Sequence, residues 1–123
     1  MARYDFLNIN PLGLKESDCV IRAIALTLDE DYYTIKRKLE LVAELFECEE
    51  LCVCCYKFLL DDVYGLDRIE EYAGVTIEEF SKYHPTGTFL IRVDGHLTAL
   101  IEGTLYDIWD AREEIVRIVW VVK

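Results

Sequence analysis

The sequence has only two prolines, Pro11 and Pro85, and six glycines among 123 residues, and no stretch rich in Pro, Gly or Ser divides it. It also lacks internal repeats and low-complexity segments. A chain of this length can bury roughly two-thirds of its unfolded surface around one core. Hydrophobic residues make up 53% of the chain, which excludes the composition typical of disorder. We expect a single globular domain spanning residues 1–123.

Long apolar runs and basic residues are also scarce. No run approaches the roughly 18 residues of a membrane-spanning helix, and the opening MARYDFLNINPLG does not resemble a signal peptide. The chain has 13 Lys and Arg against 24 Asp and Glu, a net charge of -11. Its field repels nucleic acid backbones and anionic lipids. We therefore expect a cytoplasmic protein that binds neither nucleic acid nor membranes.

The hydrophobic period of the first two-thirds of the chain predicts helices. The run CVIRAIALTL, residues 19–28, is apolar nearly all round and indicates a buried helix with Ser17 or Asp18 as its N-cap. Three further helices are expected: one capped by Asp31 with apolar residues recurring to Phe46, one from Leu51 to about Tyr64, and one from Thr76, which has capping-box spacing to Glu79.

After Pro85 the period changes to two, which predicts strands at about 87–93, 96–101, 104–109 and 115–122. The connections between them are short, so neighbouring strands should be antiparallel. We expect an α+β fold in which N-terminal helices pack on a C-terminal antiparallel sheet of three to four strands.

Cys19 is the first candidate for chemistry, because it lies in the first turn of the predicted buried helix. The unpaired N–H groups and the dipole at a helix N-terminus favour a negative charge, so this sulfur can be held partly as thiolate. The simpler interpretation is that Cys19 packs as a small hydrophobic side chain. The choice depends on whether a base lies beside it.

His96 is the candidate base, at the start of a predicted strand. If Glu102 and Gly103 form a two-residue hairpin turn, paired residues have numbers that sum to 205. His96 and Asp107 then lie on one face as diagonal neighbours. A turn one residue longer would present Asp110 instead. A thiol, an imidazole and an orienting acid supply the three roles of nucleophilic thiol catalysis.

This arrangement resembles the papain-like cysteine peptidases, in which the nucleophile heads a central helix and the His and the Asn or Asp follow from a sheet. The segments DCVIRAIA and GHLTALIEGTLYDIWD are most similar to compact bacterial and phage members such as the bacteriocin-processing leader peptidases. The resemblance implies a papain-like domain with Cys19 as nucleophile, His96 as general acid and base, and Asp107 as orienting acid, with no cofactor. It also implies that Trp109 shields the His–acid pair from water.

Members of this family usually carry a Gln a few residues before the Cys, where it helps to form the oxyanion hole. This chain has no Gln, and Gly13 stands six residues before Cys19. Asn10 or Asn8 is the candidate substitute, with the backbone N–H of Cys19 as the other donor. Losing one such donor can cost on the order of a hundredfold in rate.

Four further cysteines lie close together in CEELCVCC: Cys48, Cys52, Cys54 and Cys55. Neighbours in sequence bridge one another with difficulty, so we expect reduced thiols that pack in the core. A metal site is the alternative, but zinc sites prefer paired C-x2-C knuckles, and on a single helix Cys54 would point away from the other three. His84 is a rival base, but it precedes Pro85 and has no acid at hairpin distance, which favours a structural role.

The predicted function is that of a small thiol hydrolase, a peptidase or amidase that acts on an amide or isopeptide bond of a peptide or protein substrate. The alternative is a non-catalytic acidic module on the same fold that binds or inhibits another protein by occupying a basic groove on that partner. The acidic runs are otherwise explained as solvated helix faces and caps. No metal site is expected in the chain.

Overall fold

The structure is a computed structural model that describes residues 2–13, 18–49 and 52–123. Its elements in chain order are β1 (Arg3–Phe6), α1 (Cys19–Leu28), α2 (Tyr32–Phe46), α3 (Val53–Phe58), the π-helical turn η1 (Leu59–Val63), β2 (Asp67–Ile69), α4 (Ile77–Tyr83), β3 (Thr88–Val93), β4 (His96–Ile101), β5 (Thr104–Asp107) and β6 (Ile118–Val121). The predicted α+β class is confirmed: across these ranges the fold has four α-helices and a six-stranded mixed sheet.

The sheet is larger than the sequence predicts. Its strand order is β1-β5-β4-β3-β6-β2, and β1 runs parallel to β5 while the other pairs are antiparallel. The expectation of three to four antiparallel strands is therefore wrong. The two missed strands, β1 and β2, are three or four residues long and mostly exposed. Strands this short and this polar carry no alternating pattern, so the sequence gives no signal for them.

The hairpin between β4 and β5 has the predicted register. Ile101 pairs with Thr104 and Ala99 pairs with Tyr106, so the numbers of paired residues sum to 205. Glu102 and Gly103 form the turn, and their φ values of 47° and 76° suit a turn that needs two left-handed residues. This register puts residues 96, 98 and 107 on the same face of the sheet.

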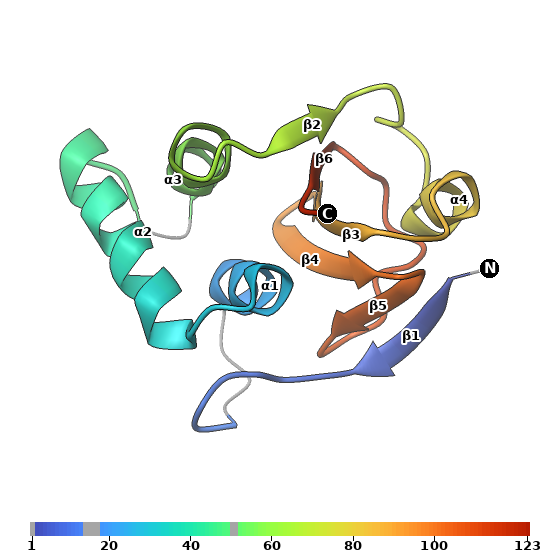
Figure 1. Ribbon diagram of the computed structural model, residues 1–123, viewed down its shortest axis with the longest axis horizontal. Helices are drawn as coiled ribbons and strands as arrows, with labels where there is room; N and C mark the ends of the chain where they lie inside the picture. The colour runs from blue at the N-terminus through green and yellow to red at the C-terminus, as the bar shows by residue number, and fades with distance from the viewer. Residues whose placement is uncertain (1, 14–17, 50–51) are drawn as a thin grey trace.

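Two hydrophobic cores lie on opposite faces of the sheet. One face is covered by α1, which packs between β4 and α2, while Tyr56 of α3 contacts Trp120 of β6 (Figure 1). The opposite face is covered by α4. Alternate residues of β3 serve the two cores, with Leu90 on the α1 side and Phe89 and Ile91 on the α4 side. Helix α1 is therefore enclosed by protein on two sides, which explains its nearly uniform apolar sequence.

The helix ends agree with most of the predicted caps. Asp31 accepts hydrogen bonds from the backbone N–H groups of Tyr33 and Thr34, and Thr76 accepts one from Glu79 at 3.1 Å. The third helix was expected from Leu51, which lies outside the described residues. In the structure α3 begins at Val53, and it continues as a π-helical turn.

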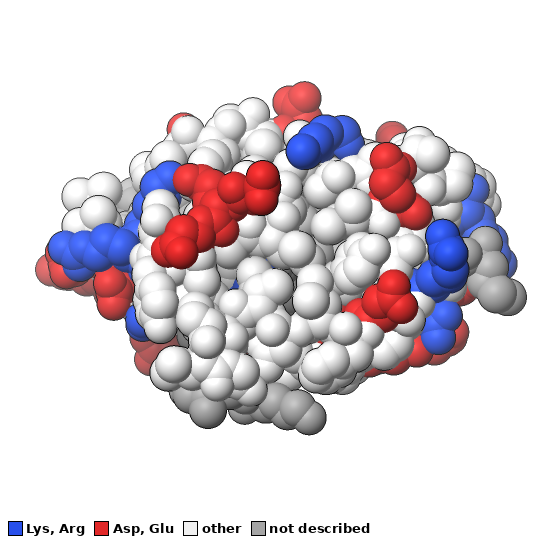
Figure 2. Space-filling view, turned by 60° about the horizontal axis from the view of Figure 1, so that its bottom comes forward, with Lys and Arg blue, Asp and Glu red and all other residues white. Residues whose placement is uncertain are grey.

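On the face shown in Figure 2, Asp and Glu form separate groups with uncharged surface and basic residues between them. No described helix combines the length and the apolar character that crossing a membrane requires.

The cap at Asp31 can be tested by mutation. Asp31→Ala leaves two N–H groups of α2 without their acceptor, so the free energy of unfolding should fall by about 1 kcal/mol. Asp31→Asn retains an acceptor oxygen and should lose less. Urea denaturation followed by circular dichroism measures both, with the exposed Glu44→Ala on the same helix as the control. Equal stability of the two Asp31 variants would contradict the capping role.

Candidate active site

Cys19 is the first residue of α1, and α1 packs against β4, which begins at His96. All five cysteines lie within the described ranges, and Cys19 alone is unpaired and half-buried. The side chains of Cys19 and His96 line one pocket, and each shifts the pKa of the other toward its charged form. Residues 77 positions apart in the sequence are thus brought into contact by the docking of one helix on one strand.

Asp107 holds the other side of the imidazole. Its Oδ2 atom lies 2.5 Å from His96 Nε2 and accepts a hydrogen bond from Thr98 Oγ1 at 2.6 Å. Its Oδ1 atom accepts the backbone N–H of Ile108 at 2.7 Å. The Nε2 atom of His96 therefore faces Asp107, which leaves Nδ1 free of this carboxylate.

The alternative acid, Asp110, does not approach the imidazole. Its carboxylate accepts hydrogen bonds from the guanidinium of Arg112 at 2.7 and 2.9 Å. The two-residue turn is the reason, because it places Asp107 on the face of His96. Trp109 packs against the imidazole with ring centroids 4.8 Å apart, and the side chain of His96 is 10% exposed. This is the position from which Trp109 was expected to shield the pair.

The surroundings of Cys19 favour its thiolate. Burial raises the pKa of the thiol, but the hydrogen bonds from the His96 side chain and the Leu97 backbone outweigh it, together with the positive charges of His96 and Arg22. The net pKa of Cys19 lies below its ordinary value. A thiol with a lowered pKa beside a positive group is the arrangement that activates cysteine as a nucleophile.

The imidazole is stabilised in its protonated form. Burial lowers the pKa of His96. Hydrogen bonds and charge interactions with Asp107 and Cys19 raise it by more, so that the pKa of His96 is about 9. Burial also raises the pKa of Asp107, and the hydrogen bonds from His96, Thr98 and the Ile108 N–H reverse that shift and keep the carboxyl ionised. The pKa of Cys19 is thus lowered and that of His96 raised, so the site favours a thiolate–imidazolium pair beside an ionised Asp107.

Arg22 completes the site, and the sequence interpretation missed it. Its guanidinium is buried and donates to Asp18 Oδ1 at 2.6 Å and to Asp107 Oδ1 at 3.4 Å. It therefore neutralises a carboxylate on each side. The signal was present in CVIRAIALTL, because an unpaired arginine within an apolar helix would be too costly to bury, so a partner had to exist.

The residues before Cys19 behave differently from the expectation. Asp18 is the N-cap residue of α1, but within the described chain its side chain caps no helix N–H group. Its Oδ2 accepts hydrogen bonds from the Tyr32 hydroxyl at 2.8 Å and from Asn10 Nδ2 at 2.9 Å. The Asn10 amide is directed at Asp18 and Tyr32, so its proposed oxyanion role gains no geometric support. Ser17, the other predicted cap, is outside the described residues.

A pocket of about 350 Å³ opens beside the Cys19 sulfur. Its lining residues come from α1, α3, β3 and the start of β4: Cys19, Val20, Val53, Tyr56, Arg92, Gly95, His96 and Leu97. Arg92 and Tyr56 add polar groups to a wall that is mostly apolar. A substrate placed here would meet both the sulfur and a positive charge.

The remaining candidates lie away from this site. His84 packs among aromatic rings, stacked on Phe80 with centroids 4.8 Å apart, which agrees with a structural role.

The cysteine cluster differs from the expectation of reduced thiols on one helix. Its sulfurs are paired as Cys48–Cys55 and Cys52–Cys54, and all four lie within 4.8 Å of one another. Cys48 precedes α3, so the assumption of one helix was wrong.

No protein-family model, curated protein or solved structure matches the chain. The chemistry open to the site is therefore set by its own geometry. A thiolate with a lowered pKa can attack an electrophilic carbon, and the adjacent imidazolium can deliver a proton to the group that leaves.

Arg22→Met tests how much the Arg22 cation stabilises the two buried carboxylates. Removing the cation leaves Asp18 and Asp107 with less compensation, so the free energy of unfolding should fall by about 3–5 kcal/mol at pH 7. The control is Arg37→Met, which removes an exposed ion pair with Glu40 and should cost at most about 1 kcal/mol. Urea denaturation measures both, and equal losses would contradict the role of Arg22.

The deficit of Arg22→Met should depend on pH. Burial raises the pKa of Asp18, and the hydrogen bonds from Asn10, Tyr32 and Arg22 bring it below its ordinary value. A lowered pKa contributes stability that is present above the unfolded pKa of about 3.9 and is lost as the pH falls through the folded pKa. The variant has less of this stabilisation, so its difference from the wild type should shrink as the pH falls from 7 to about 3.

Proposed function

We propose that the protein is a small thiol hydrolase, a peptidase or amidase of papain-like type that cleaves amide or isopeptide bonds. The observation that carries the proposal is the His96 imidazole held between the Cys19 sulfur and the Asp107 carboxylate, 2.5 Å from the latter, at the edge of a pocket. This arrangement shifts the pKa values of Cys19 and His96 toward their charged forms. Such shifts cluster at functional sites and are less common among cysteines and histidines with a structural role.

In the proposed reaction the Cys19 thiolate attacks the carbonyl carbon of the substrate. His96 transfers the proton on Nδ1 to the amine nitrogen as the carbon–nitrogen bond breaks, which leaves a thioester on Cys19. Neutral His96 then takes a proton from water, the resulting hydroxide attacks the thioester, and the sulfur leaves as thiolate. Asp107 keeps the ring oriented throughout and stabilises its positive charge.

The developing oxyanion has one evident donor. The backbone N–H of Cys19 belongs to the first turn of α1, where N–H groups have no acceptor within the helix. The Asn10 side chain is occupied by Asp18 and Tyr32, so it supplies no second donor in this arrangement. We therefore expect slower turnover than in an enzyme with two preorganised donors.

The pocket favours a substrate that carries a carboxylate. Arg92 lies in its wall, in a chain whose net charge is -11. The long-range field repels an acidic substrate, so a local cation at the pocket is the feature that would select one. An acidic side chain or a terminal carboxylate next to the scissile bond fits this charge.

The nucleophile can be tested by alkylation of the reduced protein. A thiol with an ordinary pKa of about 8.5 is only about one part in a thousand thiolate at pH 5.5. Cys19 should instead be alkylated by iodoacetamide well ahead of the other cysteines at this pH, as measured by peptide mass spectrometry. His96→Ala should remove the advantage. Equal reactivity of the five thiols would favour the acidic binding module instead.

A peptidyl epoxide tests the acid–base role, because opening its ring requires both a thiolate and a proton donor. Asp107→Ala should slow inactivation by about a hundredfold or more, whereas Asp107→Asn keeps an acceptor for the imidazole and should be impaired less. Asp110→Ala, at the end of the same hairpin, is the matched control and should react as the wild type does. Loss of reaction in the control alone would contradict the assignment.

The proposed substrate preference has its own test. Paired epoxides that differ only in Glu or Gln beside the warhead should react at different rates, with the Glu compound faster. Arg92→Met should abolish the difference, because a charged hydrogen bond worth about 1.5 kcal/mol or more corresponds to roughly tenfold. Arg117→Met, which removes an exposed partner of Asp94, should preserve it. An unchanged ratio in Arg92→Met would rule out selection by this cation.

A further inference from the structure

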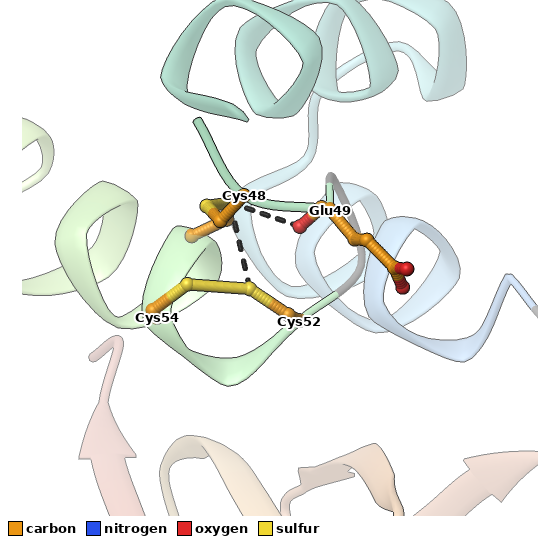
Figure 3. Close-up of a disulfide and its surroundings, with 5 residues drawn as sticks. Cys48, Glu49, Cys52 and Cys54 are labelled. Atoms are coloured by element: carbon orange, nitrogen blue, oxygen red, sulfur yellow. Dashed lines mark hydrogen bonds between the residues drawn. A yellow bond between two sulfur atoms is a disulfide. The ribbon is translucent and has the colours of Figure 1, made fainter. Parts of the chain in front are cut away.

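We infer that Cys48, Cys52, Cys54 and Cys55 form a four-thiolate site for one zinc ion when the protein is reduced. Their sulfur atoms all lie within 4.8 Å of one another, at the junction between the end of α2 and the start of α3 (Figure 3). Four sulfur ligands are the donor set of a closed, structural zinc site. The site is separate from the Cys19 site and does not depend on the proposed hydrolase activity.

The spacing of the sulfurs suits a tetrahedral ion. With zinc–sulfur bonds of about 2.3 Å, tetrahedral geometry puts the ligands about 3.8 Å apart. The Sγ atoms of Cys52 and Cys55 are 3.7 Å apart. Cys48 and Cys54, which would have to move apart from Cys55 and Cys52 once the sulfur–sulfur bonds are reduced, are half-buried and exposed.

The local backbone explains how one short segment supplies four ligands. Glu47 ends α2 in the left-handed conformation, with φ at 54°, which turns the chain back at Cys48. Cys52 is the extended N-cap of α3, and Cys54 and Cys55 lie in its first turn. The ligands therefore come from a turn and a helix start, so the paired-knuckle pattern is not required.

The paired cysteines of the structure represent the oxidised alternative. Cys48 and Cys55 have Cα atoms 7.1 Å apart, beyond the usual range for a disulfide, whereas a metal ion between two sulfurs spans a wider gap. The two cysteines of each disulfide are close in sequence: Cys48 and Cys55 are 7 positions apart, and Cys52 and Cys54 are 2 positions apart. Such short loops constrain the unfolded chain little, so these disulfides add less stability than long-range ones.

The two states interconvert by balanced steps. Two equivalents of a dithiol reductant supply four electrons and four protons, reduce both sulfur–sulfur bonds and are themselves oxidised to two disulfides. Zinc then replaces the four thiol protons, including the one on Cys55, whose sulfur lies 3.0 Å from the Glu49 carbonyl oxygen. Metal loading should therefore fail in the oxidised protein and release protons in the reduced one.

The position of the site gives it a structural consequence. Helix α3 carries Val53 and Tyr56, which line the pocket beside Cys19, and Cys55 on the same helix is fully buried in the core. An ion that joins the end of α2 to the start of α3 fixes this wall of the pocket. Loading should therefore raise the melting temperature of the reduced protein.

Cobalt provides the direct test, because four sulfur ligands give tetrahedral Co²⁺ intense visible bands and a thiolate charge-transfer band. The reduced wild type should bind one equivalent of Co²⁺ with this spectrum, and zinc should displace it. Cys19→Ala is the matched control and should bind equally. Cys52→Ser should lose the four-sulfur spectrum and most of the affinity. A wild-type protein without stoichiometric binding, or a Cys52→Ser spectrum unchanged from the wild type, would overturn the inference.

Alkylation provides a test that needs no variant in the cluster and is therefore insensitive to misfolding. Zinc should protect four of the five cysteines of the reduced protein from iodoacetamide, while Cys19 still reacts. Addition of a chelator should expose all five. Uniform labelling with and without zinc would contradict the site, even if Cys19 proved to be an active nucleophile.

Discussion

The buried carboxylate of Asp107 is the interaction on which the candidate site depends. It receives donors from three elements: His96 and Thr98 on β4, Arg22 on α1, and the backbone N–H of Ile108 at the end of its own strand. Each donor compensates part of the cost of removing the charge from water. Because the donors come from different elements, the same carboxylate also fixes where α1 lies on the sheet. Cys19, the first residue of α1, is positioned by that docking.

Burying the charged side chains of the site costs stability that hydrophobic residues in the same places would not lose. Asp18, Arg22 and Asp107 are each at least 94% buried, and buried ion pairs rarely stabilise more than an apolar substitute would. Their value lies in alignment. Asp18 binds Arg22, Arg22 reaches Asp107, and Asp107 orients the imidazole, so a shift of α1 along the sheet would break several charged hydrogen bonds together. The arrangement restricts the helix to one position.

The sequence predicted those parts of the fold that follow from local rules. A two-residue turn fixes strand parity, and parity alone put His96 and Asp107 on one face. The edge strands β1 and β2 form because a neighbour offers unpaired backbone groups, and no local pattern records that. The contact of Cys19 with His96 was predicted only through a resemblance, and the structure places both in one pocket. Arg22 was overlooked because its partners lie on other elements, and the cysteine cluster was assessed as if all four residues lay on one helix.

The chain thus contains two kinds of sulfur, distinguished by their surroundings. Cys19 stands alone among groups that favour its anion, so its reactivity depends on the positive charges of His96 and Arg22. The four clustered sulfurs have one another as nearest partners, and their chemistry is oxidation to disulfides or shared binding of a cation. A soft metal ion would neutralise the cluster without competing for Cys19, because a single thiolate paired with an imidazolium offers it only one ligand. If Cys19 is the proposed nucleophile, this segregation keeps its thiol apart from the group of cysteines that pair with one another.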